Sequence, residues 1–210
     1  MIVVHHLNNS RSQRILWLLE ELGLNYEIKR YERDPKTMLA PASLREVHPL
    51  GKSPIITDDA LTLAESGAII EYLVERYGDL KLAPARGTAE RLRYTYWLHY
   101  AEGSAMPLLV MKLIFDKFGL GNSSAVNEFV APQIKLHLDY IESELGKNTW
   151  FVGEEFTAAD IHMSFPVEVV AAQISLDESR PRLRGFLDRI HTRPAYQRAL
   201  SRGGAYELLS

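Results

Sequence analysis

The sequence of 210 residues contains no cysteine. This absence excludes disulfide bonds, thiolate metal ligands and a cysteine nucleophile. It is compatible with a reducing compartment, where disulfides are rare. Any thiolate chemistry must therefore use a thiol that arrives with a ligand.

Long apolar runs are also absent. No stretch has the roughly 20 apolar residues that a membrane-spanning helix needs. The opening "MIVVHHLNNS" has no basic residues before its apolar run, and that run is too short for a signal peptide. We therefore expect a soluble, cytoplasmic protein without a membrane partner.

A strong excess of charge of one sign is absent as well, because the formal net charge is -3. This balance does not indicate a nucleic-acid partner, and helical spacing spreads the arginines between residues 180 and 202 over solvated faces. The histidines form no i, i+4 pair, and His5 and His6 point to opposite faces of a strand, so no metal site is expected.

The first 78 residues mix strand and helix patterns. Ile2 to Leu7 is a short β-branched run that predicts a buried strand, and a helix with apolar residues at helical spacing follows until Gly23. Residues 26 to 31 alternate and predict a second strand. A strand, a helix and a strand form a βαβ unit, so the two strands should be parallel.

A short helix between residues 34 and 50 is expected next, then a hairpin turning at Asp58 to Ala60 and a helix from Ser66 to Tyr77. Residues 79 to 87 contain Pro84 and Gly87 and predict a linker. Beyond them the pattern is helical only, over 88–118, 124–145, 157–176, 181–192 and 194–203. The sequence thus predicts an α/β domain at 1–78, a linker at 79–87 and an all-helical domain at 88–210.

Ser10 stands directly before the first helix. With Gln13 it fits a capping box, in which the serine hydroxyl and the glutamine side chain each bond a free N–H group; such a cap contributes about 1 kcal/mol. A helix N-terminus also carries a partial positive charge that stabilises anions. Ser10 is therefore a helix cap, a ligand of a bound anion, or both.

Two further segments have both a structural and a functional interpretation. Ser53 and Pro54 form a turn before a strand, and a cis bond there would aim the Ser53 main chain at a ligand. Glu65 and Ser66 begin the helix that ends near Tyr77. Ser66 is a cap or a carboxylate ligand, and Glu65 could hold an ammonium group.

These segments resemble the cytosolic glutathione S-transferase family over nearly the whole chain. "SRSQRILWLLEELGLNYE" is similar to the first helix of the family, "HPLGKSP" to a motif whose proline is cis, and residues 65 to 73 to "ES-AI-EYL". "FVGEEFTAADI" resembles the family's capping box, with Thr157 and Asp160 as the reciprocal cap and Phe156 packing on Ile161. The resemblance implies an N-terminal thioredoxin-like domain and a C-terminal helical bundle domain.

The same resemblance implies a serine-type active site of the bacterial kind, with glutathione as cosubstrate and no metal. Ser10 stands four residues before Arg14, as in the serine classes, and would stabilise the glutathione thiolate. Ser12 is the rival, and its hydroxyl is expected to bond main chain or face solvent. The Ser53 main chain would pair with the cysteinyl part, Glu65 and Ser66 would hold the γ-glutamyl end, and Lys52 would lie near the glycyl carboxylate.

A small hydrophobic electrophile would bind between the domains, with Tyr100 and Met106 nearby. An equally good interpretation is that both residues belong to the core or to a dimer contact. The expected protein is a homodimeric glutathione transferase of detoxification, with glutathione-dependent peroxidase activity as a variant of the same chemistry. The alternative is a non-enzymatic glutathione-fold binding or stress-regulatory protein. A disulfide or dehydroascorbate reductase is disfavoured because it generally needs a cysteine at position 10. A dehalogenase or isomerase stays open, and the sequence does not identify the electrophile.

Overall fold

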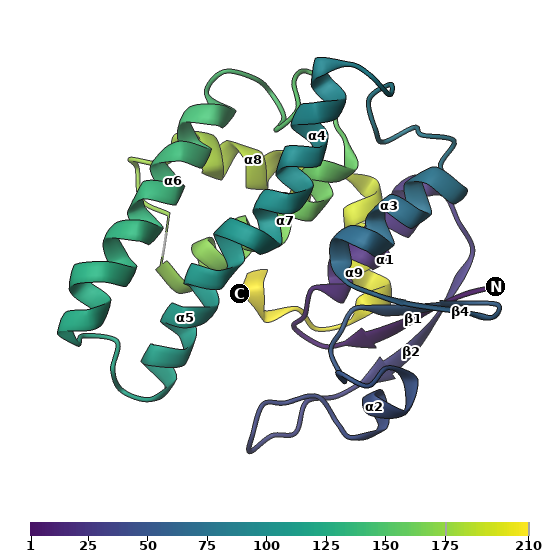
Figure 1. Cartoon of the computed structure of the whole chain (residues 1–210), viewed down its shortest axis with the longest axis horizontal. Helices are drawn as coiled ribbons and strands as arrows, with labels where there is room; N and C mark the ends of the chain where they lie inside the picture. The colour runs from purple at the N-terminus through teal and green to yellow at the C-terminus, as the bar shows by residue number, and fades with distance from the viewer. Residues whose placement is uncertain (175, 210) are drawn as a thin grey trace. The chain divides into compact units, whose positions relative to one another are not determined.

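The computed structural model describes residues 1–174 and 176–209 (Figure 1). Its packing divides the chain into two compact units. The first contains residues 1–83 together with those from 190 onward, and the second contains residues 84–189. Each unit is described separately below.

The first unit is built on a four-stranded mixed sheet in the order β2-β1-β3-β4. Its strands are β1 (Ile2–Leu7), β2 (Tyr26–Tyr31), β3 (Ile55–Asp58) and β4 (Leu61–Ala64). β1 pairs parallel with β2 and antiparallel with β3, and β3 and β4 form a hairpin. The predicted βαβ unit and hairpin are confirmed, with the bounds of the first two strands as the sequence predicts.

Helices cover both faces of this sheet. α1 (Ser12–Leu22) and α3 (Ser66–Arg76) pack against each other and against the strands, and α1 ends at Gly23 in the left-handed conformation. The short α2 (Ser43–Val47) contributes Leu44 to a cluster with Leu7, Tyr31 and Ile55. Since Leu7 alternates with His6 along β1, this cluster lies on the face opposite to His6.

The last helix, α9 (Pro194–Gly203), packs along α1 in this first unit (Figure 1). The sequence pattern instead predicts that residues 88–210 form one helical domain. Trp17 meets the ring of Tyr196 edge-on at 5.0 Å. Two glutamates of α1 also form ion pairs with arginines near the end of the chain. Arg193 pairs with Glu21, and Arg198 and Arg202 pair with Glu20. These arginines therefore attach α9 to α1 and do not form only a solvated face.

The described part of the second unit contains helices, turns and loops but no strand, as the sequence predicts. Its helices are α4 (Ala89–Tyr100), α5 (Met106–Lys117), α6 (Ala131–Leu145), α7 (Ala158–Ile174) and α8 (Pro181–His191), the last ending at the unit boundary. The predicted helices at 88–118 and 124–145 each contain a π-helical turn, at Ala101–Ala105 and Val126–Val130. Among the described residues, no helix is long and apolar enough to cross a membrane.

The buried ring of Phe151 is central to the core of this unit. It lies 4.7 Å from the ring of Trp97 on α4 and 5.0 Å from that of Phe186 on α8. Aromatic pairs at these spacings add to the stability that burial provides. The segment before α7 is thus held between two helices.

The start of α7 has the predicted cap. The carboxylate of Asp160 accepts hydrogen bonds from the Thr157 N–H and hydroxyl groups, at 2.8 and 3.1 Å, and from the Phe151 N–H at 2.8 Å. The Thr157 hydroxyl in turn accepts the Ala159 N–H. Burial raises the pKa of Asp160 to about 6, and these donors oppose that rise. The cap therefore joins the start of α7 to the aromatic core around Phe151.

Replacing Asp160 should destabilise the protein. In Asp160→Ala, buried N–H groups lose their acceptor, and we expect a loss of about 2–3 kcal/mol, measured as a lower midpoint of urea unfolding. The control is Asp139→Ala, since the exposed Asp139 pairs with Lys135 and Arg180 and should contribute below about 1 kcal/mol. Equal midpoints for the two variants would contradict the structural role of Asp160.

Candidate active site

The N-terminus of α1 is held close to the end of β1 by the turn of residues 8–11. Asn9 adopts a φ of 50°, which asparagine tolerates better than most residues. The Ser10 hydroxyl accepts the Ser12 N–H at 3.2 Å, so Ser10 does cap the first turn. The partner role expected of Gln13 is not observed: its Nε2 atom is buried without a partner, and its Oε1 atom lies against Gly203 of α9.

Ser53 lies beside Ser10 in the same unit. Its bond to Pro54 is cis, as the resemblance implied. The Ser53 hydroxyl donates to the main-chain oxygen of His5 at 3.1 Å, and the Ser10 hydroxyl lies 3.3 Å from that of Ser53. Residues 43 positions apart in the sequence are thereby brought into direct contact.

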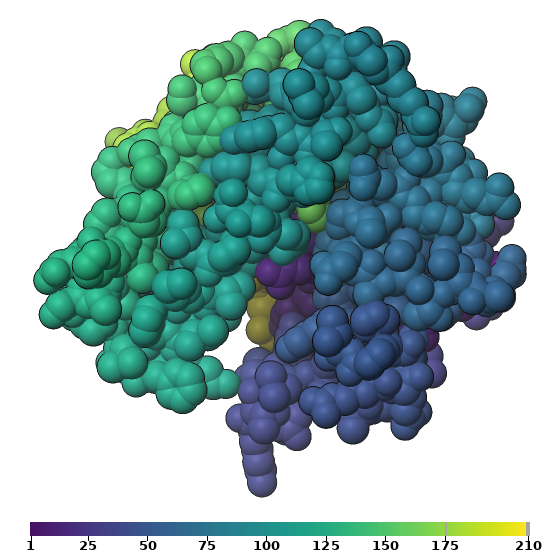
Figure 2. All heavy atoms as spheres, in the orientation of Figure 1, coloured from purple at the N-terminus to yellow at the C-terminus, as the bar shows by residue number. Residues whose placement is uncertain are grey.

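A cavity of about 400 Å³ opens next to these two serines. Ser10, Lys52 and Ser53 line it, so three of the predicted glutathione-binding residues meet in one place. The segment between β2 and α2 supplies further lining residues and stands out from the surface of its unit (Figures 1 and 2).

The cavity is cationic. Besides Lys52, the arginines 11, 33 and 45 line it, and no aspartate or glutamate belongs to its described lining. Arg33 donates to the main-chain oxygens of Asn8 and Asn9, and burial lowers its pKa, with a further contribution from the charge of Arg11. Sequence reasoning missed these arginines because they come from three separate segments. Such a cavity favours an anionic ligand.

Glu65 and Ser66 lie at the start of α3 and do not line this cavity. Glu65 is exposed and has a φ of 71°, an unusual value for a residue other than glycine. The buried Ser66 hydroxyl accepts a hydrogen bond from Arg14 at 3.1 Å. Since Arg14 belongs to α1, this bond connects the N-terminal turns of the two helices.

Ser12 makes the main-chain bond that the sequence predicts, to Leu7, but it also has two side-chain partners. It is fully buried, and its hydroxyl lies 2.8 Å from Nδ1 of His6 and 2.7 Å from the Ser10 hydroxyl, besides 3.3 Å from the Leu7 main-chain oxygen. The sequence pattern gives no signal for this contact of Ser12 with His6. In the described residues, no group of three or more potential ligands could hold a metal ion.

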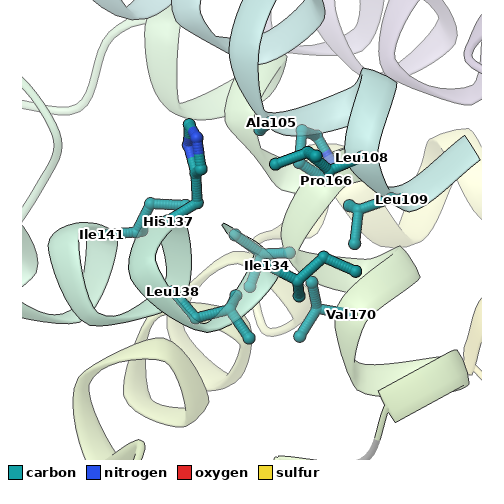
Figure 3. Close-up of a pocket in the computed structure, with 10 residues that line it drawn as sticks. Ala105, Leu108, Leu109, Ile134, His137, Leu138, Ile141, Pro166 and Val170 are labelled. Carbon is teal, nitrogen blue, oxygen red and sulfur yellow. The ribbon is translucent and has the colours of Figure 1, made fainter. Parts of the chain in front are cut away.

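Tyr100 and Met106 belong to the second unit, and both are buried. The Tyr100 hydroxyl lies 2.6 Å from Nδ1 of His137, and burial raises the Tyr100 pKa above its ordinary value. His137 also lines a small apolar cavity with Leu109 and Pro166 (Figure 3). At about 20 Å³ this cavity has room for one water molecule, which is too little for an organic substrate. A role of Tyr100 and Met106 toward an electrophile stays a prediction.

Comparison with known proteins decides the family. Residues 1–75 match the family model described as "Glutathione S-transferase, N-terminal domain", and residues 105–194 match "Glutathione S-transferase, C-terminal domain". Glutathione S-transferase 3 of Schizosaccharomyces pombe is 40% identical over 93% of this chain and 85% of that protein. The chain belongs to the glutathione S-transferase family. The expectation of a glutathione transferase with this fold is thereby confirmed.

Solved structures of this family agree with the assignment. A glutathione S-transferase from Actinobacillus pleuropneumoniae has a TM-score of 0.89 at 36% identity, covering 99% of this chain and 94% of its own. A sphingomonad glutathione S-transferase, solved in complex with glutathione, has a TM-score of 0.79 at 26% identity, covering 96% and 98%. The glutathione S-transferase fold therefore extends over almost the whole chain.

The buried His6 of this glutathione S-transferase should make folding sensitive to acid. Burial, and the nearby charge of Arg30, lower the His6 pKa from an ordinary 6.5 to about 4. As the pH falls from 6.5 toward 4, the unfolded chain gains a proton that the folded protein does not bind, so stability decreases, by up to about 3 kcal/mol.

His6→Gln removes this titration, so its unfolding free energy should fall less steeply over the same pH range, as measured by urea unfolding at a series of pH values. The matched control is His99→Gln at an exposed position of α4, which should not change the slope. Parallel curves for wild type and His6→Gln would contradict the neutral, buried state of His6.

Proposed function

We propose that this glutathione S-transferase activates glutathione as a thiolate at the N-terminus of α1, with Ser10 donating a hydrogen bond to the sulfur. The observation that carries the proposal is the position of the Ser10 hydroxyl, which lines the cationic cavity while it caps the helix. This corresponds to the serine-type site that the sequence indicates.

The energies are of the right size. Lowering a thiol pKa by about two units requires about 2.7 kcal/mol in favour of the thiolate. A helix N-terminus contributes about 0.3–1 kcal/mol to an anion, and a hydrogen bond to a charged group about 1.5–3 kcal/mol. The helix alone is thus too weak in this estimate, and the Ser10 hydroxyl supplies the larger part.

The rest of glutathione follows from the same surroundings. The Ser53 main chain would pair with the cysteinyl part, and Lys52 with the other cations would attract the glycyl carboxylate. Because the Ser66 hydroxyl accepts from Arg14, its own hydrogen is available to a γ-glutamyl carboxylate. The exposed Glu65 would receive the γ-glutamyl ammonium group.

The thiolate sulfur would then attack the electrophilic atom of a small hydrophobic acceptor, forming the new bond as that atom accepts the electron pair or loses a leaving group. A hydroperoxide is the alternative acceptor, with two glutathione molecules oxidised to the disulfide and the peroxide reduced to an alcohol and water. Thiolate formation is common to both reactions. A cytoplasmic location agrees with the supply of reduced glutathione that either one needs.

Ser10→Ala should largely abolish thiolate formation in the bound state. We expect the pKa of glutathione bound to the wild-type protein to lie about two units below that of free glutathione, and to rise by most of that amount in Ser10→Ala. The measurement is an ultraviolet titration of the thiolate on the protein. The matched control is Ser201→Ala at an exposed position of α9, which should behave as wild type.

A folded Ser10→Ala protein with the wild-type thiol pKa would contradict the catalytic role of Ser10. A wild-type protein that binds glutathione without lowering its pKa would favour the non-enzymatic binding protein. Both results are independent of which electrophile the enzyme uses.

The homodimer expected for this family is supported by exposed apolar side chains on and directly after α5. Leu113, Ile114 and Phe118 have exposed fractions of 49%, 49% and 71%. Such patches usually mark an interface with another protein surface.

Analytical ultracentrifugation should therefore give twice the mass of the chain, and Ile114→Lys should shift the population toward the monomer. Thr62→Lys, on exposed β4, is the control and should remain dimeric. A monomeric wild-type protein at micromolar concentration would contradict the proposal.

A further inference from the structure

Three buried side chains form a continuous chain of hydrogen bonds at the start of α1. The Ser10 hydroxyl lies 2.7 Å from the Ser12 hydroxyl, which lies 2.8 Å from Nδ1 of His6. The exposed fractions of Ser10, Ser12 and His6 are 5%, 0% and 4%. This series of hydrogen bonds starts at the cavity, at Ser10, and ends at His6 on β1.

The far end of this series of hydrogen bonds is the His6 ring. Nδ1 lies 2.8 Å from the Ser12 hydroxyl, closer than the Leu7 main-chain oxygen, to which that hydroxyl donates at 3.3 Å. The ring is neutral near pH 7, because burial lowers its pKa to about 4. A neutral ring nitrogen beside a hydroxyl either donates or accepts one hydrogen bond, so Nδ1 holds the Ser12 side chain in either tautomer.

The position of the Ser10 oxygen is determined by Ser12. The Ser12 hydroxyl and N–H group lie 2.7 and 3.2 Å from that oxygen, and the N–H group donates to it. The Ser10 hydroxyl also donates to the Ser53 hydroxyl oxygen, at the longer distance of 3.3 Å. A bound thiolate, being a charged and stronger acceptor, would take the Ser10 hydrogen while the contacts to Ser12 keep the Ser10 oxygen in place.

We propose that His6 and Ser12 are positioning residues of the thiolate site, and that they hold the Ser10 hydroxyl in the orientation from which it donates to sulfur. This inference rests on the proposed function of Ser10. Without the Nδ1 contact, only the longer bond to the Leu7 main-chain oxygen, at 3.3 Å, still holds the Ser12 hydroxyl, so Ser12 holds the Ser10 hydroxyl less firmly. A hydroxyl that samples several rotamers stabilises the thiolate less than one already in place.

Two substitutions at position 6 separate the two ring nitrogens. In His6→Gln the side-chain amide reaches the place of Nε2, so Ser12 loses its partner at Nδ1. In His6→Asn the amide lies near the place of Nδ1, so a hydrogen-bonding partner for Ser12 remains. The titration of bound glutathione is measured for both folded variants.

We expect His6→Gln to raise the pKa of the bound thiol by about half a unit to one unit, equal to a three- to tenfold smaller ratio of thiolate to thiol. His6→Asn should stay close to the wild-type pKa. A merely structural role of His6 would give the two variants the same thiol pKa, and that result would overturn the proposal.

Ser12 provides a second test that does not depend on changing β1. Ser12→Ala removes the middle hydroxyl of the hydrogen-bond series and should raise the thiol pKa by a similar amount. Ser12→Thr keeps a hydroxyl there and should give a thiol pKa close to that of the wild-type protein. Added to Ser10→Ala, Ser12→Ala should have no further effect, because both residues act through the Ser10 hydroxyl.

An unchanged or lowered thiol pKa in folded Ser12→Ala would overturn the proposal. The proposal would also be overturned if Ser12→Ala shifted the thiol pKa equally in the wild-type protein and in Ser10→Ala. Failure of the proposed function is distinct from these results. In that case wild type and Ser10→Ala already have the same thiol pKa.

Discussion

The burial of helix α1 is the constraint on which the site depends. Residues Ser12 to Leu19 are all buried, so the helix has no solvent-facing side over its first two turns. An enclosed helix cannot turn about its axis without breaking its contacts with the sheet, α3 and α9. An unpaired buried polar group is costly, and two polar residues of this stretch find partners inside the protein, whereas Nε2 of Gln13 does not. Ser12 finds His6, and Arg14 finds Ser66.

These internal pairs connect the helix start to its surroundings in a way that serves chemistry as well as stability. Arg14 joins the N-terminal turns of α1 and α3, the places proposed for the thiol and for the γ-glutamyl end of glutathione. The cations around the cavity are arranged without an opposing carboxylate among its described lining residues. A ligand with negative groups is therefore attracted to the place where the free N–H groups of α1 begin. In the proposed mechanism, binding and thiolate formation use one electrostatic arrangement.

The C-terminal helix shows how a distant segment holds α1 in place. α9, with Arg193 directly before it, adds Tyr196 and three arginines to α1, and its Gly203 lies against the Gln13 side chain. A side chain at position 203 would meet Gln13 at 2.4 Å, so glycine permits this close approach.

Much of the molecule could be predicted from local patterns. The strands at 2–7 and 26–31, the helix stop at Gly23 and the Thr157–Asp160 cap depend on periodicity and on neighbours within a few residues. Ser10 could be singled out because a helix start and a family motif coincide there. The partnership of Ser12 with His6, the position of α9 and the cationic cavity could not be predicted in this way. They join segments that are far apart in the sequence. Burial and long-range charge pairing select those contacts, and local periodicity contains no information about either.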